Sequence, residues 1–461
     1  MRSSVKPKDR VRMALSHEQP ERCPMQASFT PEFARRLRAE LALEARPQHN
    51  PHGGGNTYQL ERALGQDLLL ASVGWANSYY QSDQDYVDEW GVGWKVCDYD
   101  TPFGQGCYTE IATHPLADED ALTRYRPPDP NRSELYRDAK QLLRDHGQEY
   151  FIVGVTVTTV FETAWALRGL EQMMVDLVSD PDLADTLLDI PFHYHLTAAK
   201  TLAALGVDMI WTGDDVGGQS AMIISPATWR RFLKPRMARF IAEVRQVNPQ
   251  VKIAYHSDGM IAPIIPELIE IGVDVLNPVQ PACLDPARLK RDYGDRLCFW
   301  GSIDEQHTLP FGTPDEVRKE VVCRLETLGQ GGGLIIGPTH HVQLDTPLEN
   351  FWAMMDTIRD PSGGRQPTAL LEYDLYIRDS PTSEPALALG GAVAWGVADR
   401  RAARGGGAGC PRPGAPRRRP GGPAIGSPGS RLLDYGTRRP GRQGRTVARD
   451  ARARHRPACA A

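Results

Sequence analysis

The sequence contains no apolar run that approaches the roughly 20 residues a membrane-spanning helix needs. No apolar segment follows the basic stretch Met1 to Arg12, where a secretory signal would have one. None of the eight cysteines forms a C-x-x-C pair, and their scatter over 461 residues is not typical of a disulfide framework. We therefore expect a cytoplasmic protein that has no membrane partner and no zinc-ribbon site.

Lysine is absent from residues 401–461, which hold fifteen Arg, two Asp and no Glu and so carry a net charge of +13. Because the whole chain has a formal net charge of -5, the remaining residues carry -18. An acidic body argues against nucleic acid as the partner of the folded part. The 41% hydrophobic residues are enough for a full-sized core.

Residues 361–461 form a low-complexity segment rich in Arg, Gly and Pro, with stretches such as CPRPGAPRRRPGGP. Such a segment cannot bury enough apolar surface to offset the entropy lost on ordering, so we predict a disordered C-terminal tail. One alternative is a basic tail that binds nucleic acid or anionic lipid. Another is a non-native extension, since many Arg without Lys suit an out-of-frame translation of a GC-rich gene. We assign no function to this segment.

Short apolar runs alternate with helical patterns over residues 1–360. The runs are Pro24–Ser28, Asp67–Val73, Phe151–Thr156, Asp208–Thr212, Val251–His256, Val273–Asn277, Leu297–Ser302 and Gly333–Gly337. Continuous apolar runs are typical of parallel strands that are buried on both faces. Eight strand-then-helix repeats favour an α/β fold of the closed (β/α)8 TIM type. No G-x-G-x-x-G motif follows the first run, which weakens a nucleotide-binding interpretation.

Helix start signals support this pattern. Thr30-Pro31, Ser225-Pro226, Asp285-Pro286 and Thr313-Pro314 each place a capping residue before a proline suited to a first helical turn. We expect the second of these helices to run through Val247. Residues 86–115 break the rhythm, because DEWGVGWKVCDYDTPFGQGCYTEI has strand-like residues on both sides of a Gly-containing turn. This stretch predicts a β-hairpin insertion after the second strand.

Polar side chains follow the predicted strands, at the ends that would share one mouth of the barrel. Each Asp or Asn is also a common turn or cap residue, so any single one is equally well explained by local structure. The set as a whole is dense in carboxylates, imidazoles and amides. Its members are Gln26, Glu162, Asp214, Asp215, His256, Asp258, Asn277, Gln280, Asp304 and His340.

The sharpest pattern is Tyr255-His256-Ser257-Asp258-Gly259. Alternate side chains of a strand point the same way, so His256 and Asp258 are expected to face one point. With His340 after the last strand they form a set of two His and one carboxylate, which suits zinc or another divalent metal with an open position for substrate. The alternative is that both histidines are hydrogen-bonded rim residues without a metal.

Several stretches resemble the uroporphyrinogen decarboxylase superfamily. They are KPKDRVRMALSHEQPERCPM, WTGDDVGGQSAMIISPATWRRFLKPRM, IAYHSDGMIAPIIPELIEIGVDVLNPVQP, LCFWGSIDEQHTLPFGTPDEV and GGGLIIGPTHHVQLDTPLENF. The resemblance covers about residues 5–358. It implies a (β/α)8 barrel whose cavity accepts tetrapyrrole or corrinoid-linked chemistry.

Two branches of this superfamily differ at positions that can be compared here. The true decarboxylases bind a substrate with many carboxylates through an R-Q-A-G-R motif after the first strand, but this chain has Met25-Gln26-Ala27-Ser28-Phe29 and no Arg there. Cobalamin-dependent methyltransferases that act on thiols carry zinc in an H-x-C … C pattern. His256 matches the first ligand, Asp258 stands where the first Cys would be, and His340 falls near the second.

The resemblance therefore implies an enzyme nearer the methyltransferase branch. It would move a methyl group between a small-molecule substrate and a corrinoid carried by a partner protein. A His2Asp set is harder and less electron-rich than thiolates, so an oxygen- or nitrogen-bound methyl substrate, or a folate acceptor, fits no worse than a thiol. The pattern does not predict an oligomeric state.

Under this interpretation the candidate residues take separate roles. Asp214, Asp215 and Glu162 would be general acid or base or substrate anchors, with Asp304 a further catalytic candidate. Gln26, Asn277 and Gln280 would bind substrate. Two alternatives remain: a uroporphyrinogen decarboxylase in which Asp214 binds the pyrrole N–H groups, and a barrel that binds corrinoid or a small molecule without turnover.

Overall fold

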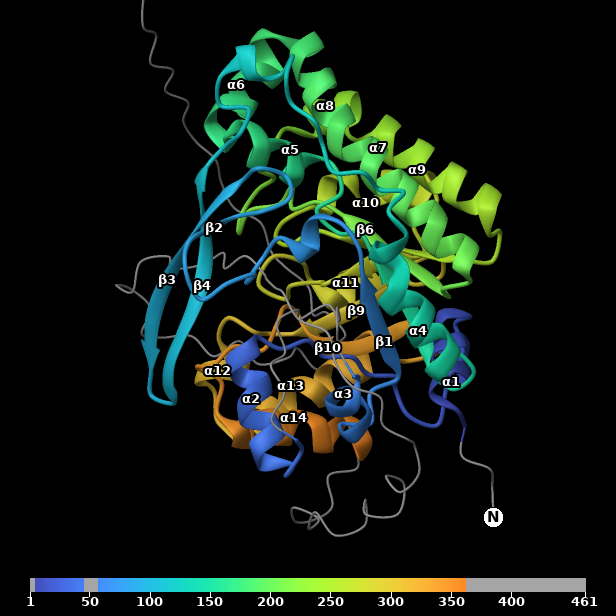
Figure 1. The fold of residues 1–461 in the computed structure, drawn as a ribbon. Coiled ribbons are helices and arrows are strands. Elements are labelled where there is room, and N and C mark those ends of the chain that lie inside the picture. The colour runs from blue at the N-terminus through green and yellow to red at the C-terminus, as the bar shows by residue number, and fades with distance from the viewer. Residues whose placement is uncertain (1–4, 45–56, 362–461) are drawn as a thin grey trace, which may run out of the picture. The chain divides into compact units, whose positions relative to one another are not determined.

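The computed structural model describes residues 5–44 and 57–361, drawn in colour in Figure 1. Residues 362–461, which hold nearly all of the predicted tail, lie outside the described residues. Seven parallel strands form one sheet in the order β1-β5-β6-β7-β8-β9-β10. Their bounds are β1 Leu68–Ser72, β5 Phe151–Val155, β6 Met209–Gly213, β7 Lys252–His256, β8 Val275–Asn277, β9 Cys298–Ile303 and β10 Leu334–Pro338. Each overlaps a predicted run, and the TIM-type α/β fold is confirmed.

The first predicted strand, Pro24–Ser28, is not a regular strand. Met25 forms an isolated parallel bridge with Ile336 of β10. Toward β1, the contacts run largely through side chains: Met25 N–H donates to Asp67 Oδ2 (2.9 Å) and Ala27 N–H donates to Gln66 Oε1 (3.2 Å). Side-chain acceptors thus replace most of the backbone hydrogen bonds that a strand would form with β1. Residues 24–28 still lie between β10 and the start of β1. Gly337 allows this approach, because a Cβ there would lie 1.9 Å from the Gln26 carbonyl oxygen.

Alternate residues of the strands separate into two apolar clusters, as the period of two in a strand requires. One cluster takes a residue from every strand of the sheet, among them Leu68, Val153, Trp211 and Trp300, and it fills the interior of the curled sheet. The residues between them, such as Ile152, pack outward with the helices. Each fully buried Leu or Val contributes about 1.5–3 kcal/mol relative to exposure. The strand pattern therefore sets both the core and the direction of the side chains at the strand ends.

Helices cover the outer face of the sheet (Figure 1). The α-helices of the described residues are α1 Pro7–Leu15, α2 Pro31–Glu40, α3 Gln59–Ala63, α4 Arg137–His146, α5 Phe161–Arg168, α6 Leu170–Ser179, α7 Pro181–Leu205, α8 Pro226–Phe232, α9 Lys234–Val247, α10 Ile265–Glu270, α11 Pro286–Tyr293, α12 Thr308–Phe311, α13 Pro314–Thr327 and α14 Leu348–Arg359. None of these described helices is long and apolar enough to cross a membrane.

The predicted helix starts are confirmed at α2, α8, α11 and α13. Asp285 caps α11 by accepting from Ala287 N–H (3.0 Å), and Thr313 forms a capping box with Glu316 at α13. The single helix expected from Pro226 through Val247 is instead two, α8 and α9. The break falls before Pro235, whose ring removes an N–H donor and disfavours helical geometry in the residue before it.

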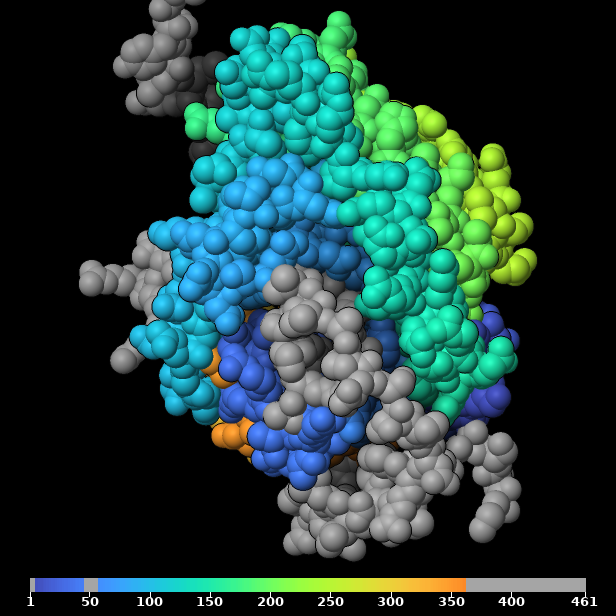
Figure 2. Space-filling view, viewed as in Figure 1, coloured from blue at the N-terminus to red at the C-terminus, as the bar shows by residue number. Residues whose placement is uncertain are grey.

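The predicted hairpin insertion is present as a separate antiparallel sheet, β2 Tyr86–Val87, β3 Gly93–Thr101 and β4 Gly104–Thr113. At its base the Asp88 carboxylate accepts hydrogen bonds from Val92 N–H and the Trp94 indole, both at 2.9 Å. At its tip the Arg36 guanidinium of α2 lies 4.4 Å from the centroid of the Phe103 ring. Figure 2 shows the hairpin and α2 side by side on one face.

Candidate active site

A cavity opens at the carboxyl ends of the parallel strands, the edge where polar residues were expected to converge. It is open to solvent on one side, and its lining combines polar and aromatic side chains, as binding sites for organic substrates do. Eight of the candidate residues line it: Gln26, Glu162, Asp215, His256, Asp258, Asn277, Gln280 and His340. Asp214 and Asp304 do not line it.

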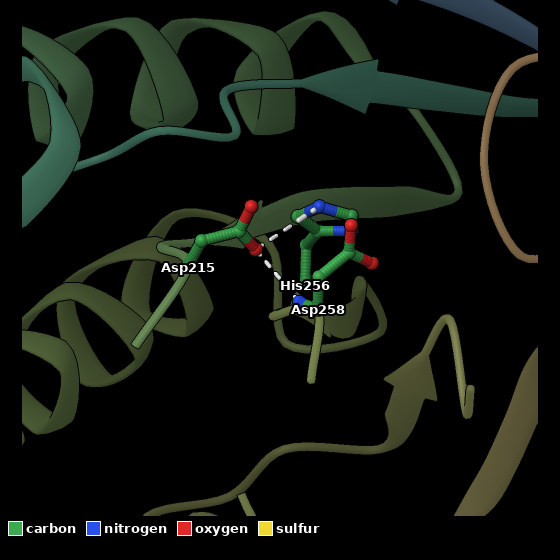
Figure 3. A group of neighbouring side chains, drawn as sticks. All are labelled: Asp215, His256 and Asp258. Carbon is green, nitrogen blue, oxygen red and sulfur yellow. Dashed lines mark hydrogen bonds and ion pairs between the residues drawn. The ribbon is translucent and has the colours of Figure 1, made fainter. Parts of the chain in front are cut away.

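Asp215, His256 and Asp258 form a compact group, and Figure 3 shows the three side chains gathered together. Asp215 follows β6, His256 ends β7 and Asp258 lies two residues further on. One ligand atom from each lies within 4.8 Å of the others. His256 Nε2 is 3.5 Å from Asp215 Oδ1, which also accepts a hydrogen bond from Asp258 N–H at 2.7 Å. Gly213 keeps β6 close to β7 here, because a Cβ would lie 2.2 Å from the His256 carbonyl oxygen.

Asn277, at the end of the neighbouring strand β8, fixes the orientation of His256. The Asn277 side-chain NH2 donates to the Trp300 carbonyl oxygen (3.2 Å), which leaves Asn277 Oδ1 as an acceptor. His256 Nδ1 lies 2.7 Å from that oxygen and therefore donates to it. When the ring is neutral, this hydrogen bond leaves the lone pair of Nε2 free to bind a metal ion. A hydrogen bond of this kind to the far nitrogen is the usual support of a metal-binding histidine.

The group concentrates negative charge in a buried place. Burial raises the pKa of Asp258, and burial together with the charge of Asp258 raises the pKa of Asp215. Burial alone would lower the pKa of His256, but the carboxylates of Asp215 and Asp258 outweigh it, and that pKa is raised. Asp258 Oδ1 is shielded from solvent and has no hydrogen-bond partner in the described part of the chain. A cation bound here would relieve both the like-charge repulsion and the unpaired oxygen.

Glu162, the second residue of α5, faces the same group. Its Oε2 accepts a hydrogen bond from Asp215 N–H at 2.8 Å. Burial and the neighbouring carboxylates of Asp215 and Asp214 raise the pKa of Glu162 well above its ordinary value. A carboxyl whose pKa is raised in this way is a candidate general acid.

His340 lines the cavity but is outside the compact group. Burial and the nearby His256 lower the pKa of His340 to about 4, so its ring is neutral at neutral pH. The sequence pattern predicted His340 as the third ligand beside His256 and Asp258. In the structure the third residue of the compact group is Asp215. His340 is close enough to the group for its pKa to respond to both His256 and Asp215.

Asp214 faces away from the cavity and holds the first turn of α5. Its Oδ1 accepts hydrogen bonds from Val160 N–H (2.9 Å) and Glu162 N–H (3.1 Å), and the residue is only 1% exposed. Burial, against these hydrogen bonds, raises the pKa of Asp214 to about 6. Asp304 likewise makes local contacts, since its Oδ1 accepts from Gln306 N–H at 2.9 Å. Both residues take the turn or cap role that was the alternative for each carboxylate.

We expect Asp214→Ala to lower the free energy of unfolding by about 1–3 kcal/mol, because two buried N–H groups of the α5 start lose their acceptor. Asp214→Asn keeps one side-chain oxygen and is expected to lose less. Urea unfolding followed by circular dichroism measures both. Unchanged stability in Asp214→Ala together with complete loss of activity would contradict this role and return Asp214 to the catalytic candidates.

Twelve of the lining residues were not among the candidates, and four of these bear on the chemistry of the cavity. Glu305 follows β9 and is 8% exposed, and Tyr79 accepts a hydrogen bond from the Trp75 indole (2.7 Å). Trp211 and Trp300 also line the cavity, and their ring centroids are 4.6 Å apart. Alternate side chains of β6 and β9 face the interior of the sheet, and this alternation could have predicted that both tryptophans point inward. No pattern in the sequence marks Tyr79.

Comparison with known proteins gives the family of the chain. The family model described as Uroporphyrinogen decarboxylase (URO-D) matches residues 97–361. The chain belongs to this family. A methylcobamide:CoM methyltransferase, MtaA of Methanosarcina barkeri, is 30% identical over 226 residues, which are 49% of this chain and 63% of that protein. The uroporphyrinogen decarboxylase of Psychromonas ingrahamii is 25% identical over 186 residues, 40% of this chain and 50% of that protein.

The matched regions thus span about half to two thirds of the length of these relatives. Among solved structures, a methyltransferase from Methanosarcina mazei has a TM-score of 0.55 at 20% identity and covers 78% of this chain and 99% of its own. That likeness confirms the fold. Both kinds of relative in sequence are enzymes, so the family includes methyl transfer and decarboxylation.

Proposed function

We propose that this URO-D family protein is a methyltransferase that moves a methyl group between a small-molecule substrate and a corrinoid carried by a partner protein. The observation that supports it best is the group of Asp215, His256 and Asp258, which lies in the cavity with His256 held by Asn277. The relatives named as methylcobamide methyltransferases support the corrinoid partner.

The donor set fits zinc or another divalent cation. Two carboxylates and one neutral imidazole would supply a charge of -2, and the unpaired Asp258 Oδ1 would gain a partner. Asp215, His256 and Asp258 would hold the ion. When bound, it would supply Lewis-acid polarisation of the heteroatom that carries or receives the methyl group.

The chain's own residues supply the remaining functions. In the direction that removes methyl from the substrate, the bond between methyl and heteroatom breaks and its electron pair stays on the heteroatom. The methyl would be taken up by the electron pair of the reduced, cobalt(I) form of the corrinoid. Glu162, with its raised pKa, is placed to give a proton to that heteroatom. Trp211 and Trp300 add aromatic surface to the cavity, and Gln26 and Gln280 offer amide contacts to the substrate.

The decarboxylase alternative lacks this support. It assigned the binding of pyrrole N–H groups to Asp214, whose carboxylate is instead occupied by backbone N–H groups at the start of α5. The described residues that line the cavity include no Arg or Lys to pair with a polycarboxylate substrate.

One experiment separates the three functions. The full chain, supplied with zinc, is incubated with methylcobalamin and a panel of thiols, amines and alcohols, and in parallel with uroporphyrinogen. Acceptor-dependent loss of methylcobalamin is expected. Release of carbon dioxide from uroporphyrinogen without methyl transfer would instead support the decarboxylase. Absence of any turnover, with cobalamin still bound by His256→Ala and Asp258→Ala, would support a barrel that only binds.

Asn277→Ala is expected to weaken binding of the metal by about 10- to 100-fold, because His256 loses the acceptor that orients its ring. Asn277→Asp retains an oxygen opposite His256 Nδ1 and is expected to restore most of the affinity. Competition against a zinc-binding dye gives both values.

Asn350→Ala is the matched control, because Asn350 is equally buried but donates to the carbonyl oxygens of Leu309 and Gly312. It should leave zinc affinity unchanged. Equal affinity in wild type and Asn277→Ala would contradict the orienting role.

A further inference from the structure

Glu305 is a buried carboxylate in the cavity that the proposed chemistry does not use. It follows β9, and its backbone N–H donates to Thr339 Oγ1 at 3.3 Å. Its Oε1 accepts a hydrogen bond from Gln343 N–H at 3.3 Å. Its Oε2 is shielded from solvent and has no partner among the described residues. Burial, and then the charge of Asp345, raise the pKa of Glu305 well above its ordinary value.

Glu305 stands apart from the candidate metal site. Glu305 is not one of the three residues whose ligand atoms lie within 4.8 Å of one another, and the charges that act on it come from Asp345 and Asp304. A divalent ion at Asp215, His256 and Asp258 would therefore balance that group and leave Glu305 without a counter-charge.

The lining as a whole has an excess of acid. Its described residues include the carboxylates Glu162, Asp215, Asp258 and Glu305 and no Lys or Arg. Burying a carboxylate without a partner is costly, and an ammonium group with its N–H donors is the partner that satisfies both its charge and its lone pairs. The faces of Trp211 and Trp300, which line the same cavity, favour a cation and do not repel it.

We propose that Glu305 binds a protonated amine of the ligand, and that the enzyme's substrate is a small organic cation rather than an anion. The second half rests on the proposed methyl transfer, whereas binding of an amine at Glu305 does not. Gln306 and Gln343, which also line the cavity near Glu305, offer additional carbonyl acceptors for the remaining N–H donors.

Three probes of equal size test the charge preference: butylammonium, butanol and butyrate. Their dissociation constants are measured at neutral pH on the zinc-supplied full chain by ligand-observed NMR, without cobalamin. Butylammonium is expected to bind at least about tenfold more tightly than butanol, and butyrate more weakly than either. Glu305→Gln should remove the preference for butylammonium and leave butanol binding unchanged, while Glu305→Asp should keep part of it.

Asp304→Asn is the matched control, since Asp304 precedes Glu305 but does not line the cavity, and it should keep the full preference. Glu305→Gln is expected to have a melting temperature equal to or above that of wild type, because it removes an unpaired buried carboxyl. Equal binding of butanol and butylammonium would overturn the proposal. So would a preference that survives Glu305→Gln but disappears in Asp258→Asn, because the cation would then bind at the metal group.

The binding test and the methyl-transfer test fail separately. Butylammonium selectivity without methyl transfer would leave the Glu305 site standing and refute the proposed reaction. Methyl transfer without that selectivity would refute the Glu305 site and leave the proposed reaction standing.

Discussion

His256→Ala is expected to lower the rate constant of methyl transfer by about 10³-fold, which corresponds to about 4 kcal/mol of lost transition-state stabilisation. The side chain provides the one nitrogen ligand of the group and is held by Asn277 at 2.7 Å. Alanine removes that ligand and leaves Asp215 and Asp258 facing each other with no cation between them. The rate is measured from the acceptor-dependent loss of methylcobalamin at saturating acceptor and added zinc.

His193→Ala provides the control for this loss. His193 is an exposed histidine of α7 whose Nδ1 lies 2.7 Å from the Asp189 carbonyl oxygen, remote from the cavity lining. It should keep the wild-type rate. A His256→Ala enzyme that is folded, supplied with zinc and still transfers methyl at more than about a tenth of the wild-type rate would contradict the role given to His256.

Asp67→Ala is expected to lower the free energy of unfolding by about 3–5 kcal/mol. Asp67 is fully buried and accepts hydrogen bonds from Arg10 Nη1 (2.5 Å), Arg22 Nη1 (2.7 Å) and Met25 N–H (2.9 Å). Removal of the carboxylate takes the ion-pair partner from Arg22, leaves Arg10 with Glu21, and takes the acceptor from Met25 N–H, at the point where residues 24–28 meet β1. Chemical unfolding of the full chain measures the change.

Asp315→Ala serves for comparison, because its side chain is 79% exposed and pairs with Arg318 three residues further along α13. Its effect should stay within about 0.5 kcal/mol. A loss below about 1 kcal/mol in Asp67→Ala would show that these contacts do not hold the start of β1 to residues 24–28. Because Gln26 belongs to that segment, we also expect Asp67→Ala to disturb the cavity.

Periodicity predicted the strands well where backbone pairs with backbone. The seven runs from Asp67 onward became the parallel sheet because each is apolar on both faces and is followed by a connection long enough for a crossover. Pro24–Ser28 was predicted as a strand in the same way, but the side chains of Asp67 and Gln66 accept from the N–H groups of Met25 and Ala27. Composition does not distinguish a backbone partner from a side-chain partner.

The same parity argument explains most of the cavity. From Trp211, alternation leads to Gly213 and Asp215, and from Ala254 it leads to His256, so these residues face inward while Asp214 faces the α5 start. A strict count along β6 would therefore have chosen Asp215 over Asp214. Along β9, alternation from Trp300 would place Asp304 in the cavity, but Glu305 lines it instead. The reason is that Gly301 (φ 109°) and Ser302 (φ 78°) depart from extended geometry and change which side chain points inward. Positive φ at a serine cannot be recognised from sequence pattern.

The most direct test of the central claim is the metal content of the full chain purified without chelators, measured by plasma mass spectrometry. We expect about one zinc or other divalent ion per chain, lost in Asp215→Ala, His256→Ala and Asp258→Ala and retained in His340→Ala. A wild-type protein that binds no divalent ion, even after zinc is added, would contradict a metal centre at Asp215, His256 and Asp258 and the metal-assisted transfer proposed for it.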